Sequence, residues 1–152
     1  MLTQLLQWRA LGDLALLLAT ALMQDPLHVV LPEAHPLADR RALNIAELAD
    51  EPLGARLPED RGYLRRHAER AGFVPDMRGT TTDYSFARSL VAAGVGVSLI
   101  PSIALTPEMP GLRAVPIDPP TPTRYIGVAV PRHCDHPPVA RLVQALATSS
   151  RQ

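Results

Sequence analysis

The feature that most constrains this 152-residue chain is the alternation of strand-like and helix-like segments between glycines and prolines. Short apolar, β-branched runs predict strands, and apolar residues spaced three and four apart predict helices. From Pro26 onward, strand and helix alternate three times, and two further strands and a closing helix follow the fourth strand. This order favours an α/β fold with a mixed, largely parallel sheet flanked by helices.

The expected elements follow from these patterns and from their end signals. Asn44 lies three residues before Glu47, which is the spacing of a capping box, and Gly72 and Gly94 end two helices. Asp60 is expected to cap the second helix, and Thr82 or Asp83 the third. The expected strands are 26–32, 52–57, 75–82, 95–101, 112–117 and 124–131, and the expected helices are 44–50, 58–72, 83–94 and 137–149.

The most patterned stretch is "SLVAAGVGVSLIP", Ser89–Pro101, in which an apolar helix meets an apolar strand. Phe86, Leu90, Val91 and Ala93 recur with helical spacing before it ends. A dinucleotide-binding loop needs strand, glycine loop and then helix, whereas here the order is reversed. Gly94 and Gly96 therefore predict a helix end followed by a close backbone approach.

Charge and composition exclude several classes of function. Fifteen basic residues balance 15 acidic ones, so the chain carries no net charge that would attract nucleic acid or an anionic membrane. All the basic residues are arginine, which excludes a Schiff-base or P-loop lysine. The one cysteine, Cys134, excludes an internal disulfide and fits the cytoplasm. Leu14–Met23 resembles a signal peptide in shape, but a buried strand or helix is the favoured interpretation, and the run is too short to span a membrane.

No pattern supports a catalytic or metal centre. "RHCDH", Arg132–His136, contains metal-ligating side chains, but adjacent ligands rarely reach one ion and no second pair completes a zinc site. We therefore expect a polar loop there, with no metal, no cofactor and no catalytic residues. The chain has no Gly-x-Ser-x-Gly elbow. A small enzyme that uses His67 or Ser85 is the alternative that a turnover assay would test.

Two loops that follow strands are better candidates for binding. "LGARLPEDRGYLRRH" and "GTTTDYS" each lead from a predicted strand into a predicted helix. Ligands of open α/β sheets bind at the carboxyl ends of strands, where helix N-termini expose N–H groups. Together with Arg56, Arg61, Thr80, Thr81 and Thr82, these groups suit a small anion such as a carboxylate.

The chain resembles the effector-binding domain of LysR-type transcriptional regulators over roughly Asp25–Ala147. "VVLPEAHPLA" is similar to that family's strand-and-loop signature, "NIAELADEPLGA" to its short helix and strand, and "SLVAAGVGVSLIP" to its most recognisable segment. "LRAVPI", "TRYIGVAVPRH" and "VARLVQALA" resemble its closing strands and terminal helix.

The resemblance implies a fold like that of type 2 periplasmic binding proteins, in which two α/β lobes close over a small effector. We expect one lobe to be nearly complete and the other partial: 1–24 is a remnant of the first lobe, 25–120 the second lobe, and 121–152 the returning strand and helix of the first. The chain is then a non-enzymatic sensor. Its expected ligand contacts are Arg56, Leu57, Arg61, Thr80, Thr82, Ile100 and Pro101.

The departures from the family shape the expected partners. The winged helix-turn-helix is not among these residues, so we expect DNA binding only through a domain outside this chain. A small-molecule effector, either a carboxylate or another small anion, and a second copy or a full-length relative are the expected partners, and no membrane is. The final helix would leave Val139, Leu142, Val143 and Leu146 without their usual cover. A secreted or periplasmic solute-binding protein and an inactive fragment are the alternatives.

Overall fold

The computed structural model describes residues 17–55, 58–81, 83–131 and 136–150. The chain forms two units: unit 1 comprises residues 1–24 and 125–152, and unit 2 comprises 25–124. Two long strands, β1 (Leu17–Pro32) and β6 (Thr123–Pro131), contribute to both units. Unit 1 also holds α3 (Pro137–Ser149). The other elements of unit 2 are the 3-10 helix Ile45–Leu48, β2 (Pro52–Ala55), α1 (Pro58–Arg70), β3 (Asp76–Thr80), α2 (Tyr84–Ala92), β4 (Val97–Pro101), the 3-10 helix Ser102–Ala104 and β5 (Leu112–Pro116).

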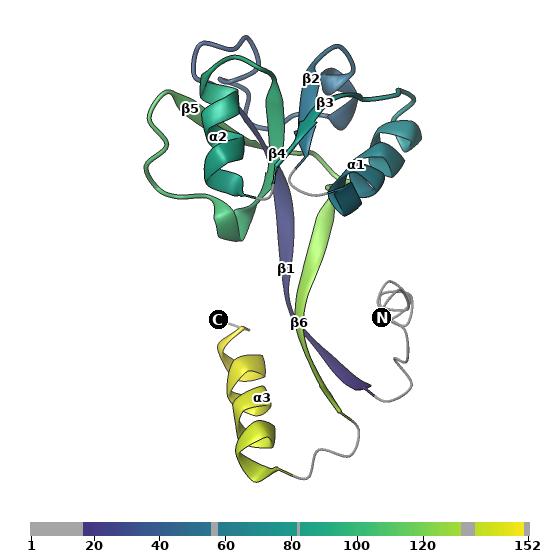
Figure 1. Ribbon diagram of the computed structural model, residues 1–152, viewed down its shortest axis with the longest axis vertical. Coiled ribbons are helices and arrows are strands. Elements are labelled where there is room, and N and C mark those ends of the chain that lie inside the picture. The colour runs from purple at the N-terminus through teal and green to yellow at the C-terminus, as the bar shows by residue number, and fades with distance from the viewer. Residues whose placement is uncertain (1–16, 56–57, 82, 132–135, 151–152) are drawn as a thin grey trace. The chain divides into compact units, whose positions relative to one another are not determined.

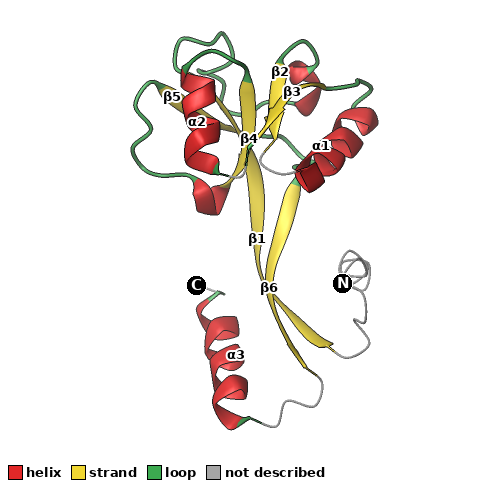
Figure 2. Ribbon diagram, in the orientation of Figure 1, coloured by secondary structure: helices red, strands yellow, loops and turns green. Residues whose placement is uncertain are grey.

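Unit 2 is built on a mixed sheet in the order β3-β2-β4-β1-β5, with β6 paired to β1. The parallel pairs are β2 with β3 and β2 with β4, whereas β1 is antiparallel to β4 and β5. Helices α1 and α2 cover opposite faces of this sheet (Figure 1), and loops connect most of the elements (Figure 2). The predicted α/β class, with a mixed sheet and flanking helices, is confirmed. The expectation that the sheet is largely parallel is wrong, because β1 pairs antiparallel with both of its neighbours β4 and β5.

The core lies on both faces of β4, all five residues of which are buried. Because side chains alternate along a strand, Val97 and Leu99 join the larger apolar cluster on one face, while Ile100 joins Val30 and Val91 on the other. A strand covered on both faces reads as a continuous apolar run. This explains why the sequence predicts β4 well.

The first strand is longer than expected. The prediction began it at Pro26, but β1 runs from Leu17, so the described part of the apolar run Leu14–Met23 is a strand. β6 pairs with β1, and a Cβ on Gly127 would lie 2.7 Å from the carbonyl oxygen of Thr20. The backbones of β1 and β6 thus approach each other closely near the start of β1. The start of β1 is therefore set by its partner strand β6 and not by the local sequence.

The buried face of α2 also differs from the prediction. Ala87 and Val91 are buried against the sheet, whereas Phe86 is 56% exposed. Ala87 and Val91 are four residues apart and Tyr84 extends the same face, so the helix is rotated away from Phe86. The cap prediction at Asp83 is confirmed, since its carboxylate accepts from the Ser85 N–H. This bond also holds the pKa of Asp83 below its ordinary value.

The glycine pair after α2 is structural, as predicted. Gly94 has φ +73°, and the N–H groups of Gly94 and Val95 donate to the carbonyls of Val91 and Leu90. These two bonds form a Schellman motif, which requires the left-handed backbone that glycine adopts without strain. A Cβ on Gly96 would lie 2.3 Å from the carbonyl oxygen of Pro52. Gly96 is therefore the place where the backbone entering β4 passes the start of β2.

Helix α1 packs with Leu64 and Ala68 buried; the two residues are four apart and so lie on one face of the helix. It begins at Pro58, two residues before the predicted cap at Asp60, because proline fits the first turn of a helix. In unit 1, none of the described side chains of α3 is buried, and Leu142 is 59% exposed.

Burial, with the guanidinium groups of Arg70 and Arg66, holds the pKa of the His67 imidazole below its ordinary value. The His67 ring lies 4.6 Å from that of Tyr63. Between the lowered pKa and the unfolded value of about 6.5, the unfolded chain binds more protons. The free energy of unfolding therefore falls as the pH drops through this window. As the pH falls from neutral to about 5, we expect the free energy of unfolding to fall less for His67→Gln than for the wild type. Urea unfolding midpoints at each pH measure this difference. Equal losses in both proteins would contradict this.

Candidate functional site

The carboxyl ends of β2, β3 and β4 lie at one end of the sheet in unit 2, because these strands are parallel. Beyond Pro101, the last residue of β4, the chain turns into the 3-10 helix Ser102–Ala104. Open α/β sheets bind ligands at this end of their strands. The side chains that gather there come from β1, β6, α2 and this 3-10 helix.

Ser102 and His28 meet at the end of β4. The Ser102 hydroxyl donates to the carbonyl oxygen of Pro26 at 3.1 Å and lies 3.3 Å from Nδ1 of His28. The Ser102 hydroxyl has one proton, which it donates to Pro26. A hydrogen bond between Ser102 and His28 therefore needs a proton on Nδ1 of His28, which donates it to the Ser102 oxygen. Both residues are partly exposed, so each can reach a small molecule at this end of the sheet.

Asp25, on β1, is a fully buried carboxylate beside this pair. Its Oδ1 accepts from the backbone N–H of Ile103 at 3.0 Å, and its Oδ2 accepts from Nε of Arg124 at 2.7 Å. A buried carboxylate is tolerated only when it is paired and hydrogen-bonded. Asp25 therefore fixes both the turn after β4 and the position of Arg124.

Arg124, on β6, connects three elements. In addition to Asp25, its Nη1 donates to the Tyr84 hydroxyl at 2.8 Å, and its guanidinium carbon lies 5.9 Å from the centre of the Tyr84 ring. The hydrogen bonds to Asp25 and to Tyr84 use two of the five N–H donors of the Arg124 guanidinium. The side chain remains 35% exposed, so a cation with donors to spare is held rigidly at this end of the sheet.

The structure describes only part of the predicted site. Arg56, Leu57 and Thr82 lie outside the described residues, and of Arg61 only the backbone, in α1, is described. Thr80 is exposed at the end of β3. Ile100 and Pro101 are buried at the end of β4, next to Ser102. Ile100 packs with Val30 and Val91, so only its backbone can face a ligand.

Sequence reasoning missed Asp25, Arg124, Tyr84, Ser102 and His28 as members of one cluster. Asp25 and Arg124 are 99 positions apart, and no motif connects them. The available signal was that each is a charged residue beside an apolar strand, on the two segments that the family resemblance predicts to be neighbouring crossovers. Opposite charges on paired strands are the pattern to search for.

The described residues contain neither a cluster of metal-ligating side chains nor a helix suited to crossing a membrane. Among residues 17–55, 58–81, 83–131 and 136–150, no group of three histidine, cysteine or acidic side chains could hold a metal ion. The "RHCDH" loop is described only at His136, so the prediction for its other members lies outside the described residues. No helix in the described part of the chain is long and apolar enough to cross a membrane.

Comparison with known proteins agrees with this architecture. The model of the family described as LysR substrate binding domain matches residues 9–151. The DNA-binding transcriptional dual regulator OxyR of Escherichia coli K12 is 34% identical over 113 residues, which cover 70% of this chain and 36% of OxyR. The chain thus spans about a third of the length of that relative.

Two solved structures show the same fold. One is the PA01 protein of Pseudomonas aeruginosa, with a TM-score of 0.78 and 21% identity over 93% of this chain and 52% of that one. The other is the CcmR regulatory domain of Synechocystis PCC6803 in complex with 2-PG, with a TM-score of 0.77 and 21% identity over 90% of this chain and 68% of that one. The chain belongs to the LysR substrate-binding domain family.

Proposed function

We propose that the carboxyl end of β4 binds the carboxylate of a small effector, or another small anion, through Arg124, beside Ser102 and His28. The observation that carries this is the guanidinium of Arg124, which Asp25 and Tyr84 hold in place while most of its donors stay uncommitted. A preordered guanidinium binds a carboxylate through paired, charge-assisted bonds. The solved complex of the CcmR domain with 2-PG supports a small-molecule ligand for this fold.

The residues expected from the sequence complete the proposed site. Ligands at the ends of parallel strands contact several loops at once. Thr80 ends β3, and Pro101 ends β4, at the same end of the sheet. We include with them the other members of the expected set, Arg56, Leu57, Arg61, Thr82 and Ile100.

We also propose binding without turnover, in keeping with a regulatory family. A Ser–His pair is catalytic when the histidine removes the serine proton and a carboxylate orients the histidine. Here the Ser102 hydroxyl donates to the carbonyl of Pro26, and the oxygens of Asp25 are bonded to Ile103 and Arg124. The geometry supports a polar binding wall better than a nucleophile.

The activity of the whole regulator is proposed on the family alone. This chain would sense an effector in the cytoplasm, and DNA binding would reside in a helix-turn-helix domain of the complete regulator. A second copy or a full-length relative would be its protein partner. We propose no metal and no cofactor for it.

The test is a thermal-shift screen with small carboxylates and their neutral amides, followed by calorimetric titration. We expect a carboxylate, and not its amide, to raise the melting temperature, because only the anion pairs with Arg124. Arg124→Lys, which keeps a positive charge beside Asp25 but loses the paired donors, should weaken binding about tenfold. Arg113→Lys, which makes the same change in an exposed ion pair, is the matched control. The proposal fails if no carboxylate binds, or if both variants bind equally well.

A further inference from the structure

A separate pocket lies in unit 2 between α2 and the sheet, and the register of three strands creates its floor. Gly54 pairs with Gly79 on one side and with Ser98 on the other. Residues in register on adjacent strands point to the same face. A row of two glycines and a serine therefore leaves bare peptide backbone beneath the helix, where larger side chains would fill the space.

The wall of this pocket is apolar. Ala87, Leu90 and Val91 of α2 line it from above, and Val95 lines it from the turn before β4. Its volume is about 190 Å³. An apolar cavity of about 150 Å³ holds a benzene molecule. The pocket is therefore large enough for one six-membered ring with a small substituent, and its flat glycine floor suits a planar ring.

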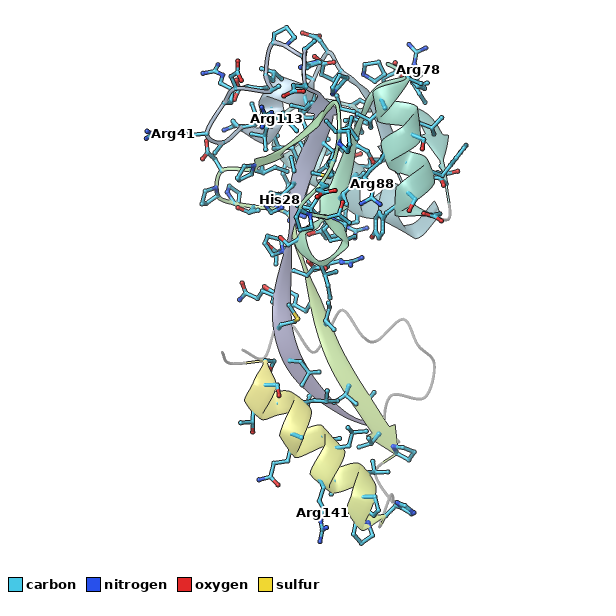
Figure 3. All side chains as sticks on the ribbon, turned by 90° about the vertical axis from the view of Figure 1, so that its left-hand side faces the viewer. His28, Arg41, Arg78, Arg88, Arg113 and Arg141 are labelled. Carbon is cyan, nitrogen blue, oxygen red and sulfur yellow. The ribbon has the colours of Figure 1, made fainter. Side chains whose placement is uncertain are left out.

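Among the described residues that line the pocket, Arg78 is the one cation. The pairing of β2 with β3 places Leu53 opposite Met77 and Gly54 opposite Gly79, so Arg78 is the extra residue of a β-bulge. A bulge redirects its side chain, and Arg78 lines the pocket together with the hydroxyl-bearing Thr81. Arg78 lies beside one end of α2 (Figure 3). Its Nε pairs with Asp76 at 2.6 Å, an exposed contact that leaves the terminal nitrogens able to donate.

We propose that this pocket is a second small-molecule site, distinct from the end of β4, that binds a planar one-ring compound carrying a carboxylate. The ring would lie on the glycine floor under α2, and the carboxylate would reach Arg78 at the rim. Apolar walls with one well-placed polar group are the usual composition of such sites. The proposal goes beyond the effector site at Arg124 and does not depend on it.

The test uses the whole chain, labelled with nitrogen-15, and benzoate as the probe. We expect benzoate to shift the amide signals of Gly54, Gly79 and Val95, and benzamide and acetate to shift them much less. Each of these two controls lacks either the charge or the ring. Arg78→Gln should weaken benzoate binding about tenfold, because a hydrogen bond to a charged group is lost. Arg113→Gln is the matched control, since Arg113 also lies on a strand in an exposed ion pair, with Glu33 at 2.8 Å.

Two variants add a side chain to the pocket at positions where the backbone leaves room for a Cβ. A Cβ on Gly79 meets nothing within 4 Å, and a Cβ on Gly54 makes only ordinary contacts, the nearest at 3.8 Å. Gly79→Leu and Gly54→Ala should both reduce the benzoate shift at Val95, and Arg113→Gln should leave it unchanged. Shifts that survive both filling variants, or that disappear in Arg113→Gln, would place benzoate elsewhere and overturn the proposal.

Self-association is the competing use of this surface. Phe86, on α2, is 56% exposed, and Val95, just after α2, is 50% exposed. A second copy of the chain could pack against these two side chains instead of a small molecule entering the pocket. Sedimentation of the wild type and Gly79→Leu across a concentration range separates the two cases. Identical sedimentation of the two proteins supports a small-molecule pocket. Association of the wild type that Gly79→Leu abolishes would overturn it in favour of an interface between copies.

Discussion

Replacing Arg124 with alanine is expected to lower the free energy of unfolding by about 3 kcal/mol. The reason is that Asp25 is fully buried and Arg124 is its ion-pair partner, at 2.7 Å. Without the guanidinium, the carboxylate stays in an apolar environment with the Ile103 N–H as its remaining bond. The partial exposure of Arg124 admits some water, which keeps the cost near the lower end of the range for broken buried pairs. Urea unfolding followed by circular dichroism measures it.

The matched control for this prediction is Arg113→Ala. Arg113 pairs with Glu33 at 2.8 Å, but more than half of each side chain is exposed. Exposed pairs contribute about 0–1 kcal/mol. If Arg124→Ala costs no more than Arg113→Ala, Asp25 is not held as the structure indicates. Asp25→Asn combined with Arg124→Ala should cost less than the two changes added together, because the buried charge is then absent.

Gly96→Ala is expected to lower the free energy of unfolding by about 3 kcal/mol. Its new methyl group would lie 2.3 Å from the carbonyl oxygen of Pro52 and 3.0 Å from the carbonyl carbon. Both atoms belong to the backbone of β2, so they cannot move aside as the end of a flexible side chain would. Either β2 or the turn before β4 has to shift, and β4 is the central, fully buried strand of the unit.

Gly79→Ala provides the comparison for Gly96→Ala. Gly79 is a strand glycine with open space where its Cβ would lie. Its replacement should change stability by no more than about 0.5 kcal/mol. Similar unfolding midpoints for Gly96→Ala and Gly79→Ala would show that the backbone at Pro52 yields easily, contrary to the packing seen here.

The predictions that succeeded depend on residues close together in the sequence. The capping box of Asn44 and Glu47 forms as expected, with both reciprocal hydrogen bonds. The helix end at Gly94 and the buried run of β4 are equally local. Each of these follows from a few neighbouring residues and one backbone preference. The resemblance to LysR-type regulators, confirmed by the family match, rests on the order of such local patterns.

The features that the sequence did not reveal depend on partners far along the chain. The start of β1 at Leu17 is set by β6, and the exposure of Phe86 is set by the rotation of α2 against the sheet. The Asp25–Arg124 pair and the bulge at Arg78 depend on which strands lie side by side and in what register. Neither a strand's neighbour nor its register is a local property, so both candidate sites became visible only in the folded chain.

The ion pair between Asp25 and Arg124 has a consequence for whether unit 2 can be excised from this chain and inserted into another protein. These two residues are also the first and last residues of unit 2, which is one continuous segment, whereas unit 1 is assembled from two. The segment thus enters and leaves its own fold at a single hydrogen-bonded contact of 2.7 Å. Modules whose ends meet in this way tolerate excision, circular permutation and insertion into a host protein. Residues 25–124 are therefore suited to insertion into another protein as one module, because a salt bridge already holds the two ends of the segment together.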